Sequence, residues 1–164
     1  MKLYKVLASG QKSCNGGDAQ WIPGEWMPSI EEIEPCKSGY HLCRRQDLIH
    51  WLNEEIWEAE YQGEMIIDDN KIVVQQARIT KRIDTWNERT ARLFAADCAE
   101  NVLYVWEKKY PDNKTPHNAI LAARSYANGK IDYKELDAAW DAAMDAARDW
   151  QTELLFKYLH GEII

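Results

Sequence analysis

The chain has no long apolar run and none of the short motifs typical of common catalytic chemistries. No apolar stretch in its 164 residues approaches the ~20 residues that a membrane-spanning helix needs. The sequence contains no Walker motif, no nucleophile elbow and no His-Glu-x-x-His pair. These absences argue against a membrane protein, against a P-loop nucleotidase, and against serine-hydrolase or zinc-protease chemistry.

Basic charge is also scarce. The chain has 20 Lys and Arg against 27 Asp and Glu, a formal net charge of −7 and a pI of about 5.1. Nucleic-acid-binding domains usually carry a basic patch, so we expect no direct contact with nucleic acid. Acidic residues outnumber basic ones in both halves of the chain, so the negative charge does not come from an acidic tail.

The compartment is predicted from two further features. The first eight residues are followed at once by polar residues as far as Cys14, which makes the apolar segment too short for a signal peptide. Four cysteines in a chain of this length do not require a disulfide framework. We therefore expect a cytoplasmic protein without cofactors.

Residues 1–83 alternate apolar and polar positions in several short segments, which is typical of strands. Glycines and prolines punctuate residues 9–39, which are expected to form a loop. A mixed sheet with one short helix is expected in this half. The predicted strands are Lys2–Ala8, Gly39–Cys43, Glu55–Gly63 and Lys71–Ile83, and the predicted helix is Asp47–Leu52.

Residues 84–164 carry start and stop signals for three helices. The starts are a capping box, a Thr-Pro pair and a second capping box. A capping box accepts hydrogen bonds from the free backbone N–H groups at a helix N-terminus, and a proline at the first helical position has no N–H group that needs a partner. The three starts lie at Thr85–Glu88, Thr115-Pro116 and Asp132–Glu135. The predicted helices run from residue 86 to about 109, from 116 to an Asn-Gly cap at 128–129, and from 132 to about 160. The sequence therefore predicts an α+β fold with an N-terminal half, 1–83, and a helical half, 84–164.

An acidic stripe follows one face of the predicted last helix. Its aspartates are four residues apart, so they lie in one row, with alanines beside them. One interpretation is a solvated face opposite an alanine-rich packing face. The other is a surface for a basic protein partner, because clustered charge of one sign steers association. The candidate partner-binding residues are Glu135, Asp137, Asp141, Asp145 and Asp149, with Tyr133 and Trp140 as possible aromatic anchors.

Thiols and an imidazole in the N-terminal half are weak candidates for a zinc site. Zinc is bound tetrahedrally by such groups, and His41 and Cys43 share a face if they lie on a strand. However, the chain has no C-x₂-C pair, and Cys14 and Cys36 are far apart in sequence. We therefore expect no metal, and we interpret the four residues as buried or half-buried structural side chains.

Two stretches resemble known families. Gly39–Cys43, Gln46–Leu48 and Trp57–Glu64 resemble an uncharacterised N-terminal domain common in bacteriophage and prophage proteins. The helical half resembles an immunity-protein domain of bacterial polymorphic toxin loci, in Thr90–Asn101, Tyr110–Asp112 and the segment from Ala119 to Gly129. Neither resemblance brings catalytic residues.

The resemblances imply a role in phage–host conflict, by binding and blocking another protein. The leading hypothesis is a non-enzymatic inhibitor or immunity-type protein, for example an anti-CRISPR or other anti-defence protein, in the host cytoplasm if a phage encodes it. Its partner would have a basic surface, such as a nucleic-acid-handling complex. One alternative is an enzyme acting on a nucleotide or ADP-ribose in a cleft between the halves. Another is a structural or assembly protein of a phage particle.

Overall fold

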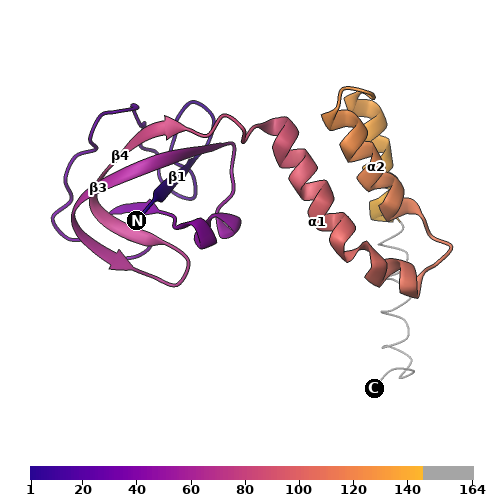
Figure 1. Ribbon diagram of the computed structural model, residues 1–164, viewed down its shortest axis with the longest axis horizontal. Helices are drawn as coiled ribbons and strands as arrows, with labels where there is room; N and C mark the ends of the chain where they lie inside the picture. Colours follow the sequence, from indigo (N-terminus) through magenta and orange to yellow (C-terminus); the bar gives the residue numbers. More distant parts are fainter. Residues whose placement is uncertain (146–164) are drawn as a thin grey trace, which may run out of the picture. The chain divides into compact units, whose positions relative to one another are not determined.

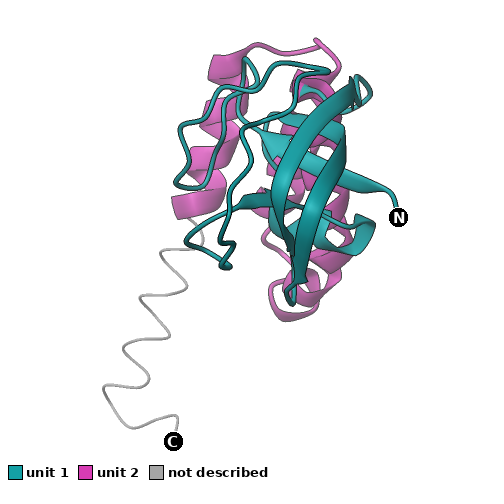
Figure 2. Cartoon of the chain, turned by 90° about the vertical axis from the view of Figure 1, so that its left-hand side faces the viewer, with its two compact units in different colours: residues 1–87 teal, residues 88–164 magenta. Residues whose placement is uncertain are grey.

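The computed structural model describes residues 1–145 and divides the chain into two compact units, residues 1–87 and 88–164 (Figure 2). Two predictions lie outside the described residues: the position of Asp149, and the course of the last helix beyond residue 145. Within residues 1–145, no helix is both long enough and apolar enough to cross a membrane.

The first unit is built on a curled, four-stranded antiparallel sheet with the strand order β1-β3-β4-β2 (Figure 1). Its strands are β1 (Leu3–Leu7), β2 (Tyr40–Leu42), β3 (Glu55–Ile67) and β4 (Ile72–Arg82). Residues 68–71 join β3 to β4 as a hairpin. All strand pairings are antiparallel, whereas a mixed sheet was expected. The difference arises because β1 and β2 lie on opposite edges of the hairpin and are joined to the next strands by long connections. No local sequence signal encodes the direction in which a strand at the end of such a connection pairs.

The two edges of the sheet meet. Tyr4 and Cys43 exchange two backbone hydrogen bonds of 2.9 and 2.8 Å, so β1 contacts the end of β2 and the curled sheet closes on itself. The inside holds the main core, in which large apolar side chains from all four strands surround the indole of Trp21. The core members are Leu3, Leu7, Trp21, Leu42, Trp57, Ile72, Val74, Ala77 and Ile79.

The long connection between β1 and β2 is ordered by the sheet rather than by regular structure of its own. The backbone N–H groups of Gly24, Met27 and Ile30 donate to carbonyls of alternate β4 residues, at 2.8 to 3.0 Å. This segment therefore covers the edge of β4 that β2 is too short to reach, an edge that would otherwise expose unpaired backbone groups.

Strand β3 continues four residues beyond its predicted end at Gly63. The sheet register shifts between Gln62 and Met65, and Gly63 has a φ of +79°. A Cβ atom at this position would lie 2.2 Å from Oε1 of Gln75. The glycine therefore marks a β-bulge inside a strand rather than the end of a strand.

The predicted short helix forms a 3₁₀ helix, η1 (Arg45–His50). The buried Asp47 carboxylate accepts hydrogen bonds from the Arg44 backbone N–H and from its guanidinium, at 2.7 to 2.9 Å. The same guanidinium donates to the carbonyls of Asp68 and Asp69 in the β3–β4 turn. Arg44 and Asp47 thereby fix this helix to the hairpin.

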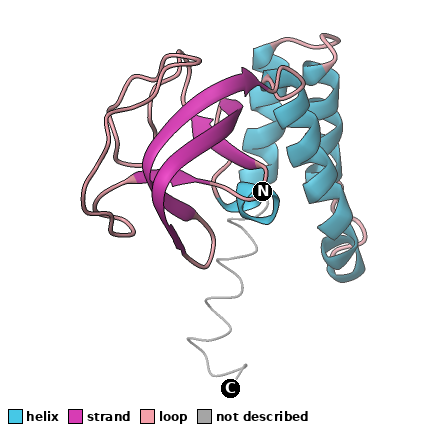
Figure 3. Ribbon diagram, turned by 60° about the vertical axis from the view of Figure 1, so that its left-hand side comes forward, coloured by secondary structure: helices cyan, strands magenta, loops and turns pink. Residues whose placement is uncertain are grey.

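The second unit is helical (Figure 3), with α1 (Glu88–Lys109), α2 (Thr115–Ala127) and a third helix that begins at residue 133. The predicted start of α1 was two residues too early. Helix α2 ends as predicted, because Gly129 adopts a φ of +66° and donates to the Tyr126 carbonyl, while Lys130 donates to that of Ser125. The α+β fold class is confirmed.

Helices α1 and α2 are joined by charged side chains as well as by packing. Arg124 of α2 pairs with Asp97 at 2.7 Å and with Glu100, both on α1. Asp97 and Arg124 thus form an ion pair between the two helices. Asp97 is not buried, however, so this pair contributes little to stability.

Candidate functional site

The described part of the acidic stripe lies on the outer face of the third helix. Asp137, Asp141 and Asp145 are all exposed, and successive members are rotated by about 40° around the helix axis. The packing face is marked by the buried Leu136 and the half-buried Ala139 and Ala143. The stripe therefore points away from the core of this unit.

Glu135 has a local structural role. Its carboxylate accepts the backbone N–H of Asp132 at 3.0 Å, and its own N–H donates to Oδ1 of Asp132 at 3.0 Å. This reciprocal pair confirms the predicted capping box. Glu135 remains exposed, but its carboxylate is committed to the start of the helix.

Large apolar side chains flank the acidic stripe. Tyr133, Trp140 and Met144 are 59, 53 and 48% exposed. They are seven and four residues apart, which places them on one side of the helix between the packing face and the aspartates. Trp140 therefore does not belong to the core of the described residues. Protein-binding surfaces commonly combine an apolar centre, enriched in Tyr, Trp and Met, with a polar rim.

The weak metal candidates of the first unit all line one pocket. Cys14, Cys36, His41 and Cys43 come from two loops and the β2 region, and the pocket that they border has a volume of about 400 Å³. Two lysines that the sequence analysis did not select, Lys5 and Lys71, line it too.

The lysines determine the electrostatics of this pocket. Nζ of Lys71 donates to Sγ of Cys36 at 3.1 Å, and Nζ of Lys5 donates to the carbonyl of His41 at 3.0 Å. Burial lowers the pKa of Lys5 to about 8. Burial and the positive charges of Lys5 and Lys71 lower the pKa of His41, so its ring is neutral at pH 7. Nε2 of this neutral ring accepts the backbone N–H of Cys36 at 3.1 Å. Burial raises the pKa of Cys43 to about 11.

These contacts give a physical reason against a zinc site. A zinc ion needs several donor atoms around one point and is repelled by nearby ammonium groups. Within residues 1–145, no group of three or more His, Cys, Asp or Glu side chains is arranged to hold a metal ion. The Cys36 thiol and the His41 ring are each engaged with other protein groups instead.

We expect protein purified without added metal to contain no stoichiometric zinc. Elemental analysis of the purified chain measures this directly, and Cys36→Ser provides the matched variant. About one zinc per chain, lost in Cys36→Ser, would contradict the expectation.

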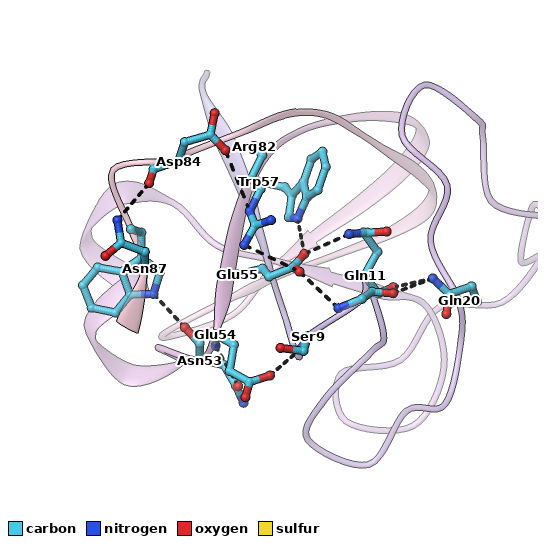
Figure 4. Close-up of polar contacts among 12 residues, drawn as sticks. Ser9, Gln11, Gln20, Asn53, Glu54, Glu55, Trp57, Arg82, Asp84 and Asn87 are labelled. Atoms are coloured by element: carbon cyan, nitrogen blue, oxygen red, sulfur yellow. Dashed lines mark hydrogen bonds and ion pairs between the residues drawn. The ribbon is translucent and has the colours of Figure 1, made fainter. Parts of the chain in front are cut away.

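A second polar cluster in this unit surrounds the carboxylate of Glu55 (Figure 4). Glu55 is 4% exposed and accepts the indole N–H of Trp57 at 2.8 Å and the backbone N–H of Gly10 at 3.1 Å. The Gln11 amide lies at 3.5 Å and the Arg82 guanidinium at 3.7 Å. These donors surround the carboxylate, which thereby joins β3 and β4 to the loop after β1. Because its oxygens are already engaged by protein groups, Glu55 does not resemble a free catalytic base.

Two family models match the chain, one over its N-terminal half and one over its helical half. Residues 1–91 match the family model of a domain of unknown function (DUF7666), and the chain belongs to this family. Residues 81–160 match the family model described as "Imm-5 like putative immunity protein". No curated protein and no solved structure matches the chain at a significant level. The match of residues 81–160 fits an immunity-type, non-enzymatic role for the chain.

Proposed function

We propose that the chain is an immunity-type protein that neutralises a protein toxin by binding it through the exposed face of its third helix. The match of residues 81–160 to immunity proteins carries this proposal, because it includes the whole described part of that helix. The contact surface consists of an apolar strip (Tyr133, Trp140 and Met144) beside an acidic strip (Asp137, Asp141 and Asp145).

The composition of this face suits a folded, basic protein. Aromatic and methionine side chains supply apolar contact area at the centre of an interface, and charges at the rim steer the partner during association. Within residues 1–145, neither Asp137 nor Asp141 is engaged in an ion pair. Their charge is therefore available to Lys and Arg side chains of a partner. A ribonuclease or deoxyribonuclease toxin would present such a basic surface, since its substrate is polyanionic.

The test is a charge reversal in the acidic strip. Asp141→Lys with Asp145→Lys should weaken binding to the toxin that the chain neutralises, sought among the products of neighbouring genes, by about tenfold at low salt, mainly through a slower association rate. The difference should shrink as the ionic strength rises, because exposed charges are screened. Surface plasmon resonance at several salt concentrations measures both effects.

The matched control reverses two charges on another helix of the same unit, those of the exposed Glu88 and the half-buried Glu107 on α1, as Glu88→Lys with Glu107→Lys. This variant changes the net charge by the same amount and should bind nearly as well as the parent. Circular dichroism should show the helical content of the parent in both variants. Equal affinity of the parent and the Asp141/Asp145 variant at low salt would remove the acidic strip from the proposal.

The same surface also suits an anti-defence version of the proposal. Here a phage or prophage encodes the chain, and the basic partner is a nucleic-acid-handling defence complex such as a CRISPR effector in the host cytoplasm. The two versions differ in what the chain protects, which is either the cell that makes the toxin or the phage that infects a defended host. Co-expression that restores growth of cells making the toxin supports immunity, whereas restored plating of phage on a defended host supports anti-defence.

A further inference from the structure

The pocket of the first unit contains a buried cation that the proposed protein-binding surface does not use. Lys5 occupies an inward-facing position of β1 between Leu3 and Leu7, and it is 9% exposed. Its ammonium donates to the His41 carbonyl and lies 4.9 Å from the centre of the Trp21 ring. A carbonyl and an aromatic ring stabilise an ammonium, but neither carries a compensating negative charge.

The other lysines of the pocket are differently placed. Lys71 pairs with Asp68 at 3.2 Å, and Lys37 pairs with Glu34 at 2.6 Å. No carboxylate pairs with Lys5 in the part of the chain that the structure describes. Lys5 is therefore the pocket lysine whose charge the protein leaves without a counter-charge, and buried charges are normally paired.

The nearby thiols do not supply that negative charge. Burial raises the pKa of Cys43 to about 11, so this thiol is neutral at pH 7. The thiol of Cys14 donates to the carbonyl of Val6 at 3.6 Å, a contact that requires its proton. Within residues 1–145, the buried ammonium therefore has no carboxylate within ion-pair distance, although the carboxylate-bearing Asp18 also lines the pocket, as do Lys37 and Lys71.

The pocket has the size and lining of a small-molecule site. Its volume of about 400 Å³ lies within the range of roughly 300–1,000 Å³ that is typical of ligand pockets. Three aromatic side chains, Trp21, Tyr40 and Trp51, form part of its lining, and Lys5 and Lys71 contribute polar groups. Apolar walls with a few convergent polar groups characterise such sites.

We propose that this pocket binds a small organic anion, whose carboxylate or phosphate pairs with Lys5 and whose apolar body lies against the aromatic lining. A bound anion would supply the counter-charge that Lys5 lacks. The ammonium of Lys5 suits either anionic group, because lysine acts as a point charge rather than as a planar fork. This site lies within the first unit and is independent of toxin binding by the third helix.

Isothermal titration calorimetry tests the proposal with two anions and their neutral counterparts. Benzoate is compared with benzamide, and adenosine 5′-monophosphate with adenosine. We expect at least one anion to bind with a Kd below ~1 mM and its neutral counterpart to bind at least about tenfold more weakly. Binding of benzoate alone assigns a carboxylate ligand, and binding of the nucleotide alone assigns a phosphate. If neither anion binds, or if the neutral compounds bind equally well, the proposal is wrong.

Lys5→Met locates the site, with Lys12→Met as its matched control. Both variants remove one positive charge, but Lys12 is exposed and does not line the pocket. Lys5→Met should weaken anion binding at least about tenfold, which corresponds to about 1.4 kcal/mol. Lys12→Met should leave it unchanged. Equal weakening in the two variants would indicate a general charge effect and would overturn the assignment.

A second measurement uses the unmodified protein, in case Lys5→Met does not fold. Cys36 lines the pocket and Cys98 lies in the other unit, and both are exposed. A saturating anion should slow the alkylation of Cys36 by iodoacetamide several-fold and leave Cys98 unaffected, as measured by peptide mass spectrometry. An unchanged rate at Cys36, or equal slowing at both cysteines, would contradict binding in this pocket.

Discussion

Glu55→Ala is expected to lower the free energy of unfolding of the first unit by about 3 kcal/mol. The substitution removes the acceptor of the Trp57 indole N–H, which is itself buried, and of the Gly10 backbone N–H. Leaving buried donors without partners costs more than a typical hydrogen bond contributes. It also removes the carboxylate that pairs with Arg82 at 3.7 Å. Urea unfolding followed by tryptophan fluorescence measures the loss.

The neighbouring glutamate provides the matched control. Glu54 accepts the backbone N–H of Ser9, so it contacts the same loop, but its carboxylate is solvent-exposed. Glu54→Ala should therefore cost much less than Glu55→Ala. Glu55→Gln should lie between the two, because an amide oxygen can still accept the indole N–H while the charge opposite Arg82 is lost. Equal effects at the two positions would show that water satisfies the donors around Glu55.

The features predicted correctly from the sequence are those encoded within a few residues. The Asp132–Glu135 box and the Asn128-Gly129 cap depend on contacts between residues three to five positions apart, and both form as expected. Strand positions were also predicted, because the alternation of apolar residues is local. The start of α1 was less accurate, since a capping sequence fixes a helix end only to within one or two residues.

The lining of the pocket could not be predicted from the sequence, because it depends on contacts between residues far apart in the chain. Cys36 and Lys71 are 35 positions apart and meet only because the loop before β2 packs against the start of β4. Nothing in the spacing of the cysteines indicates that ammonium groups lie among them, which is why zinc remained an option. Lys5 did carry a signal, because it occupies the inward position of the alternating pattern Leu3, Lys5, Leu7.

The protein-binding proposal makes its strongest prediction at Trp140. Trp140→Ala should weaken binding to the toxin by at least about 2 kcal/mol, or roughly 30-fold, mainly through faster dissociation. Tryptophan at the centre of an interface typically contributes this much, because its large apolar surface becomes fully desolvated. The side chain is 53% exposed in the described part of the chain, so the substitution should change stability little.

Tyr104→Ala is the matched control for this prediction. Tyr104 is an aromatic residue of α1, is 68% exposed, and lies outside the third helix. If the third helix forms the interface, only Trp140→Ala should lose affinity, and its loss should persist at high salt because it does not depend on charge. The Asp141/Asp145 charge reversal, in contrast, should lose its effect as salt increases. A large loss in Tyr104→Ala with none in Trp140→Ala would place the toxin-binding surface on α1 instead.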